Sequence, residues 1–161
     1  MSTQTSSTKP STTDFKGAFR QLEQTLEEYF GKKAPALPDN AKELIVKFSP
    51  WIALIMIVMF LPLLLGAFGL SALFMPFSFL GGMTQGFSFI ISWVFVVAIV
   101  VLEAIAIPGL MKREKKAWYK VYYAALLSIV QNIVTFNLGS LIIGGLISFY
   151  ILFQIKEKYT K

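Results

Sequence analysis

Glu103 is the residue of this sequence whose type and position point most directly to chemistry. It is the single charged residue between Lys47 and Lys112. On a helix, the nine residues from Glu103 to Lys112 span about 13–14 Å, which places the carboxyl near the middle of a hydrocarbon core about 30 Å thick. An ionised carboxylate there costs at least a few kcal/mol, so we expect a neutral acid or a paired one. Pro108 cannot donate to the carbonyl of Ala104, which leaves a hydrogen-bond acceptor one turn away.

Two interpretations of Glu103 stay open. In the functional one it couples protons or cations, or binds a substrate. In the structural one it donates a hydrogen bond between helices and fixes their packing. Ser128 and Ser148 lie at a similar predicted depth in the membrane on the other helices, so they are candidate hydrogen-bond partners of Glu103. The candidate intramembrane polar site therefore comprises Glu103, Ser128, Gln131, Asn132 and Ser148.

The segment 117–136 carries four polar residues at steps of three and four, so they share one face of a helix. They are Ser128, Gln131, Asn132 and Thr135. Lipid cannot satisfy amides, and this face should therefore point into a bundle or toward another subunit. Hydrogen bonding between helices and the lining of a pore both fit it. A row of small residues, Ser140, Gly144 and Ser148, predicts close helix packing within the chain or between two copies.

The absence of histidine and cysteine excludes several kinds of chemistry. Zinc, haem and iron–sulfur sites that use these ligands are excluded. Catalysis by Ser-His-Asp or Cys-His sets is excluded as well. No nucleophile–base pair is visible elsewhere, so we expect no enzyme, no metal site and no cofactor.

The elements that position these residues are apolar helices. The chain has 161 residues, of which 55% are hydrophobic and only 15% are charged, whereas soluble domains carry about 25% charged residues. Apolar runs of about 20 residues predict membrane spans. We expect an all-α polytopic membrane protein, a four-helix transmembrane bundle with spans at about 50–72, 87–111, 117–136 and 140–155.

Charge asymmetry predicts the orientation. All 15 basic residues lie in the N-terminal segment, in the 112–120 loop or in the tail 156–161. The positive-inside rule then places both termini and the middle loop in the cytoplasm, in a multi-pass protein of the cell membrane. The same rule accounts for the net charge of +6, so we expect no nucleic-acid binding.

The N-terminal segment predicts a cytoplasmic module. Residues 1–13 are rich in Ser and Thr and predict a disordered tail. Residues 14–30 place apolar side chains on one stripe of an amphipathic helix. Residues 31–49 predict a proline-containing linker and a short interfacial helix, with a new helix starting at Pro50. The stripe, which we expect to dock on a protein partner, another subunit, the chain's own loops or the bilayer, consists of Phe15, Phe19, Leu22, Leu26 and Phe30.

Three stretches carry a resemblance. They are EYFGKKAPALP with KELIVKFSPWIALI, AIPGLMKREKKAWYKVYYAALLS, and LGSLIIGGLISFYILFQIKEKY. Together they resemble small bacterial four-span membrane proteins without an assigned activity, and this implies a topology but no mechanism. Small multidrug transporters also have four spans and one membrane carboxylate, but theirs lies in the first span. Rotary-ATPase proteolipids share a lone carboxylate but are richer in glycine.

These observations leave two classes of function. The first is a non-enzymatic membrane scaffold or accessory subunit that docks partners through the helix 14–30. The second is a small oligomeric transporter or channel that uses Glu103 and the polar face of the third span. Either class implies contact with the lipid bilayer and allows a homo-oligomer or membership of a membrane complex.

Overall fold

The computed structural model describes residues 12–161; the tail predicted for 1–13 lies almost wholly outside them. The described chain is all-helical and contains no strand. Its elements are α1 (Thr12–Leu26), the π-helix η1 (Glu27–Lys33), α2 (Asp39–Ser78), the 3-10 turn η2 (Phe79–Gly81), α3 (Met83–Met111), α4 (Lys115–Val134), α5 (Leu138–Gln154) and the 3-10 turn η3 (Lys156–Lys158).

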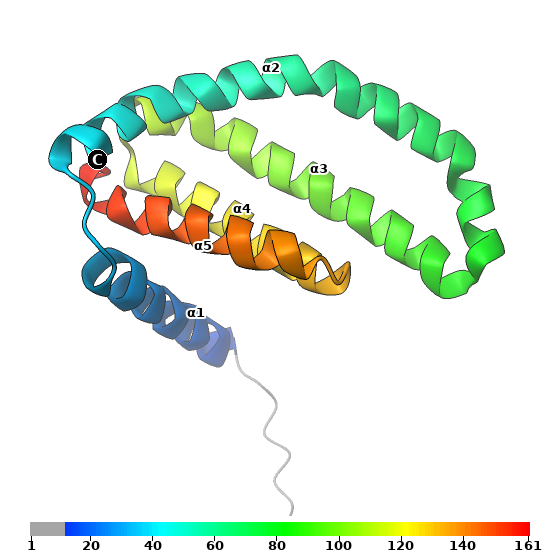
Figure 1. Ribbon diagram of the computed structural model, residues 1–161, viewed down its shortest axis with the longest axis horizontal. Helices are drawn as coiled ribbons and strands as arrows, with labels where there is room; N and C mark the ends of the chain where they lie inside the picture. Colours follow the sequence, from blue (N-terminus) through cyan, green and yellow to red (C-terminus); the bar gives the residue numbers. More distant parts are fainter. Residues whose placement is uncertain (1–11) are drawn as a thin grey trace, which may run out of the picture.

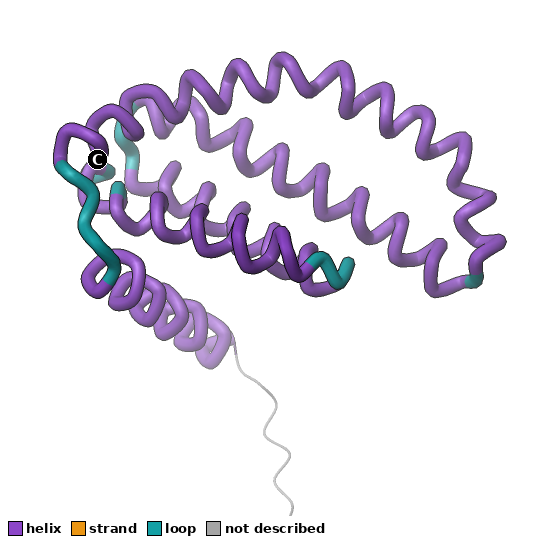
Figure 2. Tube along the Cα trace, viewed as in Figure 1, coloured by secondary structure: helices purple, strands orange, loops and turns teal. Residues whose placement is uncertain are grey.

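Two hairpins and one further helix, α1, make up the fold (Figure 1). α2 and α3 form a long hairpin that closes through η2 at one tip, while α4 and α5 form a shorter hairpin beside α3. α1 lies beneath the shorter hairpin and connects to α2 through residues 34–38, which are the longest loop between described elements (Figure 2). Gly82, at φ 108°, makes the turn into α3 in a conformation that other residues avoid.

Three helices are long and apolar enough to cross a membrane: α2, α3 and α5. α4 falls short by composition, because lysines occupy its first turns and the amides Gln131 and Asn132 lie near its end. Helix boundaries agree with the sequence prediction within four residues for α3, α4 and α5. The first predicted span differs more, because α2 begins at Asp39 and continues to Ser78.

The continuity of α2 is a departure from the predicted break at Pro50 and from a predicted loop between the first two spans. Pro50, Pro62 and Pro76 all lie inside the helix. A proline removes one backbone donor and clashes with the preceding turn, which bends a helix rather than always ending it. The helix accordingly arches away from α3 along its middle and returns to it at the tip (Figure 1).

The hydrophobic core lies at one end of the molecule. It gathers the first turns of α2, the end of α3, the start of α4 and the end of α5. Trp118 is 1% exposed, stacks on Tyr122 at a ring-centroid distance of 5.5 Å, and donates from Nε1 to the carbonyl of Leu152 at 2.9 Å. Beyond this core the helices expose large apolar side chains along most of their length.

Candidate functional site

The apolar stripe of α1 faces the chain's own helices. Phe19 meets the ring of Tyr123 edge-on at 6.5 Å, and Phe30 lies 6.2 Å from Phe149. Leu26 and Phe30 pack against the core. Leu22 is 41% exposed, and the side chain of Phe15 is not among those described. Of the predicted docking residues, therefore, three contact α4 or α5 or the core that these helices build.

Lys156 fixes the acidic side of α1 to the end of α5. Its Nζ lies 2.9 Å from a carboxylate oxygen of Glu23 and 2.7 Å from one of Glu27. The same ammonium stands over the ring of Trp118 at 5.1 Å. Tyr119 donates to Glu23 at 3.3 Å. Glu23 of α1 and Glu27 of η1 are thus bound by side chains from α4 and from the segment after α5.

Gln154 is the buried polar residue that holds the segment after α1. Its side chain is bonded at both ends: Oε1 accepts from the N–H of Leu37 at 3.1 Å, and Nε2 donates to the carbonyl of Phe30 at 2.8 Å. Tyr150 donates to the carbonyl of Pro35 at 2.6 Å. The loop 34–38 is therefore bound along its length by the last turns of α5.

Ion pairs join the start of α2 to the last described residues. Lys42 pairs with Glu157 at 2.8 Å, and Lys158 lies 3.5 Å from Asp39. Arg113, in the α3–α4 turn, pairs with Glu43 at 2.7 Å. We call this assembly the terminal cap: η1, residues 34–47, residues 112–116 of the α3–α4 turn and the start of α4, and residues 154–161.

The backbone completes the terminal cap. The N–H of Lys115 donates to the carbonyl of Lys161 at 2.6 Å, and the N–H of Lys161 donates to the carbonyl of Arg113 at 3.3 Å. Tyr159 is buried there, and burial raises the pKa of its hydroxyl. At the exposed rim, the hydrogen bond from Lys33 lowers the pKa of Glu28.

Sequence reasoning missed the terminal cap, because it treated 156–161 as a free tail. The signal was present as alternation of charge. The run KEKYTK carries Lys156, Glu157 and Lys158, and acidic residues recur at 23–28 and 39–43. One sequence shows these complementary charges but not which of them meet.

Glu103 makes no hydrogen bond or ion pair within residues 12–161, and its side chain is exposed at the surface of the chain. Ile105, two residues on, accepts from the ammonium of Lys120 at 3.4 Å. A Cβ on Gly109 would lie 2.7 Å from the Cβ of Ala117. These two contacts set the antiparallel register of α3 and α4, which places Glu103 opposite about residue 123, roughly 7–8 Å along the helix from Ser128. The structure thus does not pair Glu103 with Ser128.

The remaining predicted residues meet between α4 and α5. Ser128 and Asn132 of α4 and the row Ser140, Gly144 and Ser148 of α5 line one hollow of about 200 Å³. Asn132 donates to the carbonyl of Ser128 at 2.7 Å, so its amide is held by its own helix. A Cβ on Gly144 would meet nothing within 4 Å, whereas one on Gly145 would lie 3.4 Å from Ile129. Gly145 is therefore the close-packed position. Gln131 does not line the hollow.

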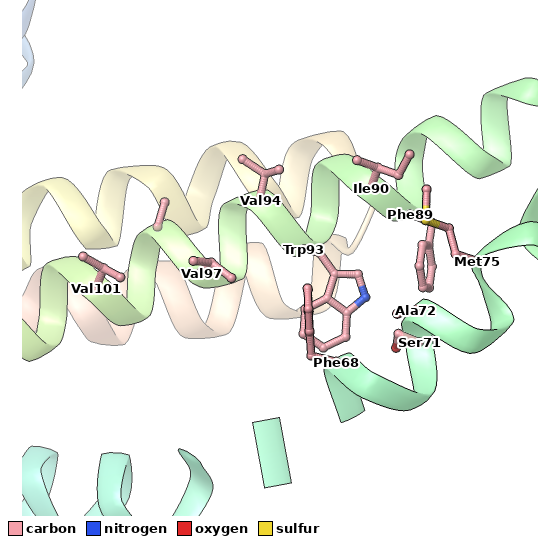
Figure 3. A pocket seen from close by; sticks show the side chains of 11 residues that line it. Phe68, Ser71, Ala72, Met75, Phe89, Ile90, Trp93, Val94, Val97 and Val101 are labelled. Carbon is pink, nitrogen blue, oxygen red and sulfur yellow. The ribbon is translucent and has the colours of Figure 1, made fainter. Parts of the chain in front are cut away.

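A cavity of about 590 Å³ opens between α2 and α3 (Figure 3). Trp93 lies at its centre and meets the ring of Phe68 edge-on at 5.2 Å. A neighbouring cavity of about 620 Å³ lies between α2, α3 and the end of α4, and it includes Ser71, Ser88, Ser92 and Thr135. No charged side chain lines either cavity.

Within the described part of the chain, no three His, Cys, Asp or Glu side chains gather as metal ligands would. The geometry offers a charge-paired terminal cap, apolar cavities and, within α3, the unpaired carboxyl of Glu103. Comparison with protein-family models, curated proteins and solved structures gives no match.

Proposed function

We propose that this chain is a non-enzymatic accessory or scaffold subunit of the cell membrane, which meets its partner inside the bilayer. The observation that carries the proposal is that the apolar surface of α2 is exposed. Its most apolar window contains no buried residue. A Cβ added at Gly66 or Gly69 would meet nothing within 4 Å. Small residues on a transmembrane helix let a second helix approach closely, and here the chain itself does not use them.

The terminal cap supports a cytoplasmic placement for both described ends. It gathers the charged ends of α2, α3, α4 and α5 on one side of the molecule. Basic residues beside membrane helices favour the cytoplasm. A four-span bundle, the sequence prediction, requires α4 and α5 to cross the bilayer together with α2 and α3.

The docking surface of this proposal is α2 rather than α1. The sequence places partner docking on the stripe of α1, but Phe19, Leu26 and Phe30 already contact the chain's own helices. Phe68 of α2 contacts Trp93 of α3, but the most apolar window of α2 has no buried residue. The role of α1 in the proposal is to brace the terminal cap.

Site-specific photo-cross-linking tests the proposal. A photoreactive amino acid replaces Gly66 or Gly69 in living membranes, and Leu64, which lines a cavity inside the chain, serves as the matched control. We expect a discrete protein adduct at the glycine positions and none at Leu64; an adduct of twice the chain's mass identifies a second copy. If the glycine positions give lipid adducts alone, the scaffold proposal is wrong.

A small transporter or channel is the second candidate, and one observation favours it. Ser92 and Ser88 lie 11 and 15 residues before Glu103, about three and four helical turns, so the three residues share a face of α3. Ser92 and Ser88 also line the 620 Å³ cavity. Proton or ion flux into liposomes that carry purified protein tests this candidate. Flux that vanishes in Glu103→Gln and persists in Glu103→Asp supports it, while the absence of flux in the unsubstituted protein rejects it.

A further inference from the structure

The two hairpins differ in reach. The turn between α4 and α5 lies beside the first turns of α3, because Thr135 and Phe136 line the same cavity as Ser88 and Ser92. α3 continues to Met83 beyond that point, and the tip of the α2–α3 hairpin follows. Through the register of α3 and α4, Phe136 lies opposite about residue 90 of α3, which is eight residues or about 12 Å before Gly82. Figure 1 shows that the shorter hairpin ends before the longer one.

Polar groups mark where the hydrocarbon begins. α1 contacts the shorter hairpin at Tyr119 and Tyr123. Glu23 lies at the depth of Tyr119, and Lys156 of the terminal cap binds both Glu23 and Glu27. A helix with such a charged side lies in the headgroup region with only its apolar face buried. Lys120 lies at the same level. Lys120 is the last charged residue of α4, and through the register of the two helices Glu103 lies about one turn beyond it on α3. We therefore take the boundary at the turn that carries Tyr123 and Glu103.

The lengths of α3 and α4 beyond this boundary indicate how far each hairpin extends into the hydrocarbon core. From Glu103 to Gly82, α3 has 21 residues, or about 31 Å, which matches a hydrocarbon core of about 30 Å. From Tyr123 to Phe136, α4 has 13 residues, or about 20 Å. The shorter hairpin would therefore cover about two thirds of the core.

We propose that α2 and α3 alone cross the bilayer, that the α4–α5 hairpin turns inside it, and that acyl chains of lipids in the far leaflet fill the space beyond the turn. This proposal rests on the membrane placement proposed above and replaces its four spans by two. It also moves Glu103 from the middle of the membrane to the boundary on the side of the terminal cap, where water reaches a carboxylate.

The turn is built for apolar surroundings. A backbone turn inside hydrocarbon must satisfy its own polar groups. The N–H groups of Thr135, Phe136 and Asn137 donate to carbonyls of the preceding turn at 2.9–3.1 Å. The side chain of Asn137 accepts from the N–H of Ser140 at 3.3 Å. Phe136, at the apex, is 84% exposed and presents an apolar ring outward.

The chemistry of the cavities favours acyl chains as the occupant. Two of the hydroxyls in the 620 Å³ cavity are already bonded to the backbone, since Ser92 donates to the carbonyl of Ser88 at 2.8 Å and Thr135 to that of Gln131 at 2.9 Å. The 590 Å³ cavity is lined by apolar residues apart from Ser71. A polar solute would give up hydrogen bonds to water there without forming new ones, whereas an acyl chain has no such bonds to give up.

Cysteine accessibility tests the depth of the turn, and the chain contains no cysteine of its own. Thr84→Cys marks the tip of the α2–α3 hairpin, and Gly139→Cys marks the α4–α5 turn, where an added side chain meets nothing within 4 Å. Intact cells or sealed vesicles receive a membrane-impermeant maleimide from the far side, and denatured samples define full labelling. We expect Thr84→Cys to react with the maleimide. Gly139→Cys should react at a rate at least about ten times lower, because hydrocarbon excludes the charged reagent.

The outcomes separate this proposal from the proposed function. If Thr84→Cys also resists labelling from the far side, the membrane placement itself fails. If both positions label equally, the four-span bundle is correct and the turn does not lie inside the bilayer.

Fluorescence tests the occupant, because Trp93 lines both cavities. The contribution of Trp93 is obtained by subtracting the fluorescence spectrum of Trp93→Phe from that of the unsubstituted protein in the same vesicles. In phosphatidylcholine with brominated acyl chains we expect that difference emission to be strongly quenched relative to unbrominated lipid. Unquenched emission would show that protein, rather than lipid, fills the space.

Discussion

Gln154→Leu tests whether α1 and the loop 34–38 belong to the fold. Leucine keeps much of the volume of glutamine but removes the bonds to Leu37 and Phe30. A buried donor or acceptor without a partner costs about 1–3 kcal/mol. With two such groups, and with partial relief when the segment opens to water, we expect a loss of about 2–4 kcal/mol of local stability.

Limited trypsinolysis of the protein in detergent or nanodiscs measures that loss, because Lys32 and Lys33 are exposed in the segment that Gln154 holds. A cost of 2–4 kcal/mol predicts cleavage about 30- to 700-fold faster, since each 1.4 kcal/mol is a factor of ten in an opening equilibrium. Gln24→Leu, at an exposed position of α1, is the matched control and should cleave at the original rate. Equal rates for Gln154→Leu and the control would refute the argument that α5 anchors this segment.

The other predictions concern packing and charge. Gly109→Leu should destabilise the chain by about 1–3 kcal/mol or more through overpacking against α4, whereas Gly66→Leu should leave the thermal unfolding midpoint of the isolated chain nearly unchanged. Tyr122→Phe should be neutral or slightly stabilising in the same assay, because its buried hydroxyl finds no partner in the described part of the chain. A double-mutant cycle of Arg113→Met with Glu43→Gln should give a coupling of about 1 kcal/mol or less, because both side chains are over 40% exposed; a much larger coupling would contradict this estimate.

Periodicity and composition predicted the helices well. Apolar runs located α3 and α5, and α1 and η1 lie over the segment 14–30 that was predicted to be helical. These features are local, because a helix needs only its own backbone bonds and one apolar face. The continuity through Pro50 was not predictable in this way, since a proline ends some helices and bends others according to the packing around it.

The relations between helices could not be read from one sequence. Depth matching paired Glu103 with Ser128, but the register that Gly109 and Ala117 impose moves the two apart. Ser128 and Asn132 of α4 line one hollow with the small row of α5, while Glu103 and Gln131 of the predicted polar site lie outside that hollow. Which faces meet depends on the angles of the turns and on side-chain volumes, and a helical pattern carries neither.

The terminal cap has a consequence for the order in which the chain matures. Gln154 binds Phe30 across 124 positions of sequence, so at about 5–20 residues per second the ribosome needs roughly 6–25 s to deliver the partner of a segment already made. During that interval Leu26 and Phe30 have no α5 to cover them. The terminal cap can form only when both hairpins are in place, so a formed cap indicates that insertion of the chain is complete. A quality-control protease or chaperone that recognises the uncovered stripe of α1 would distinguish complete chains from stalled ones.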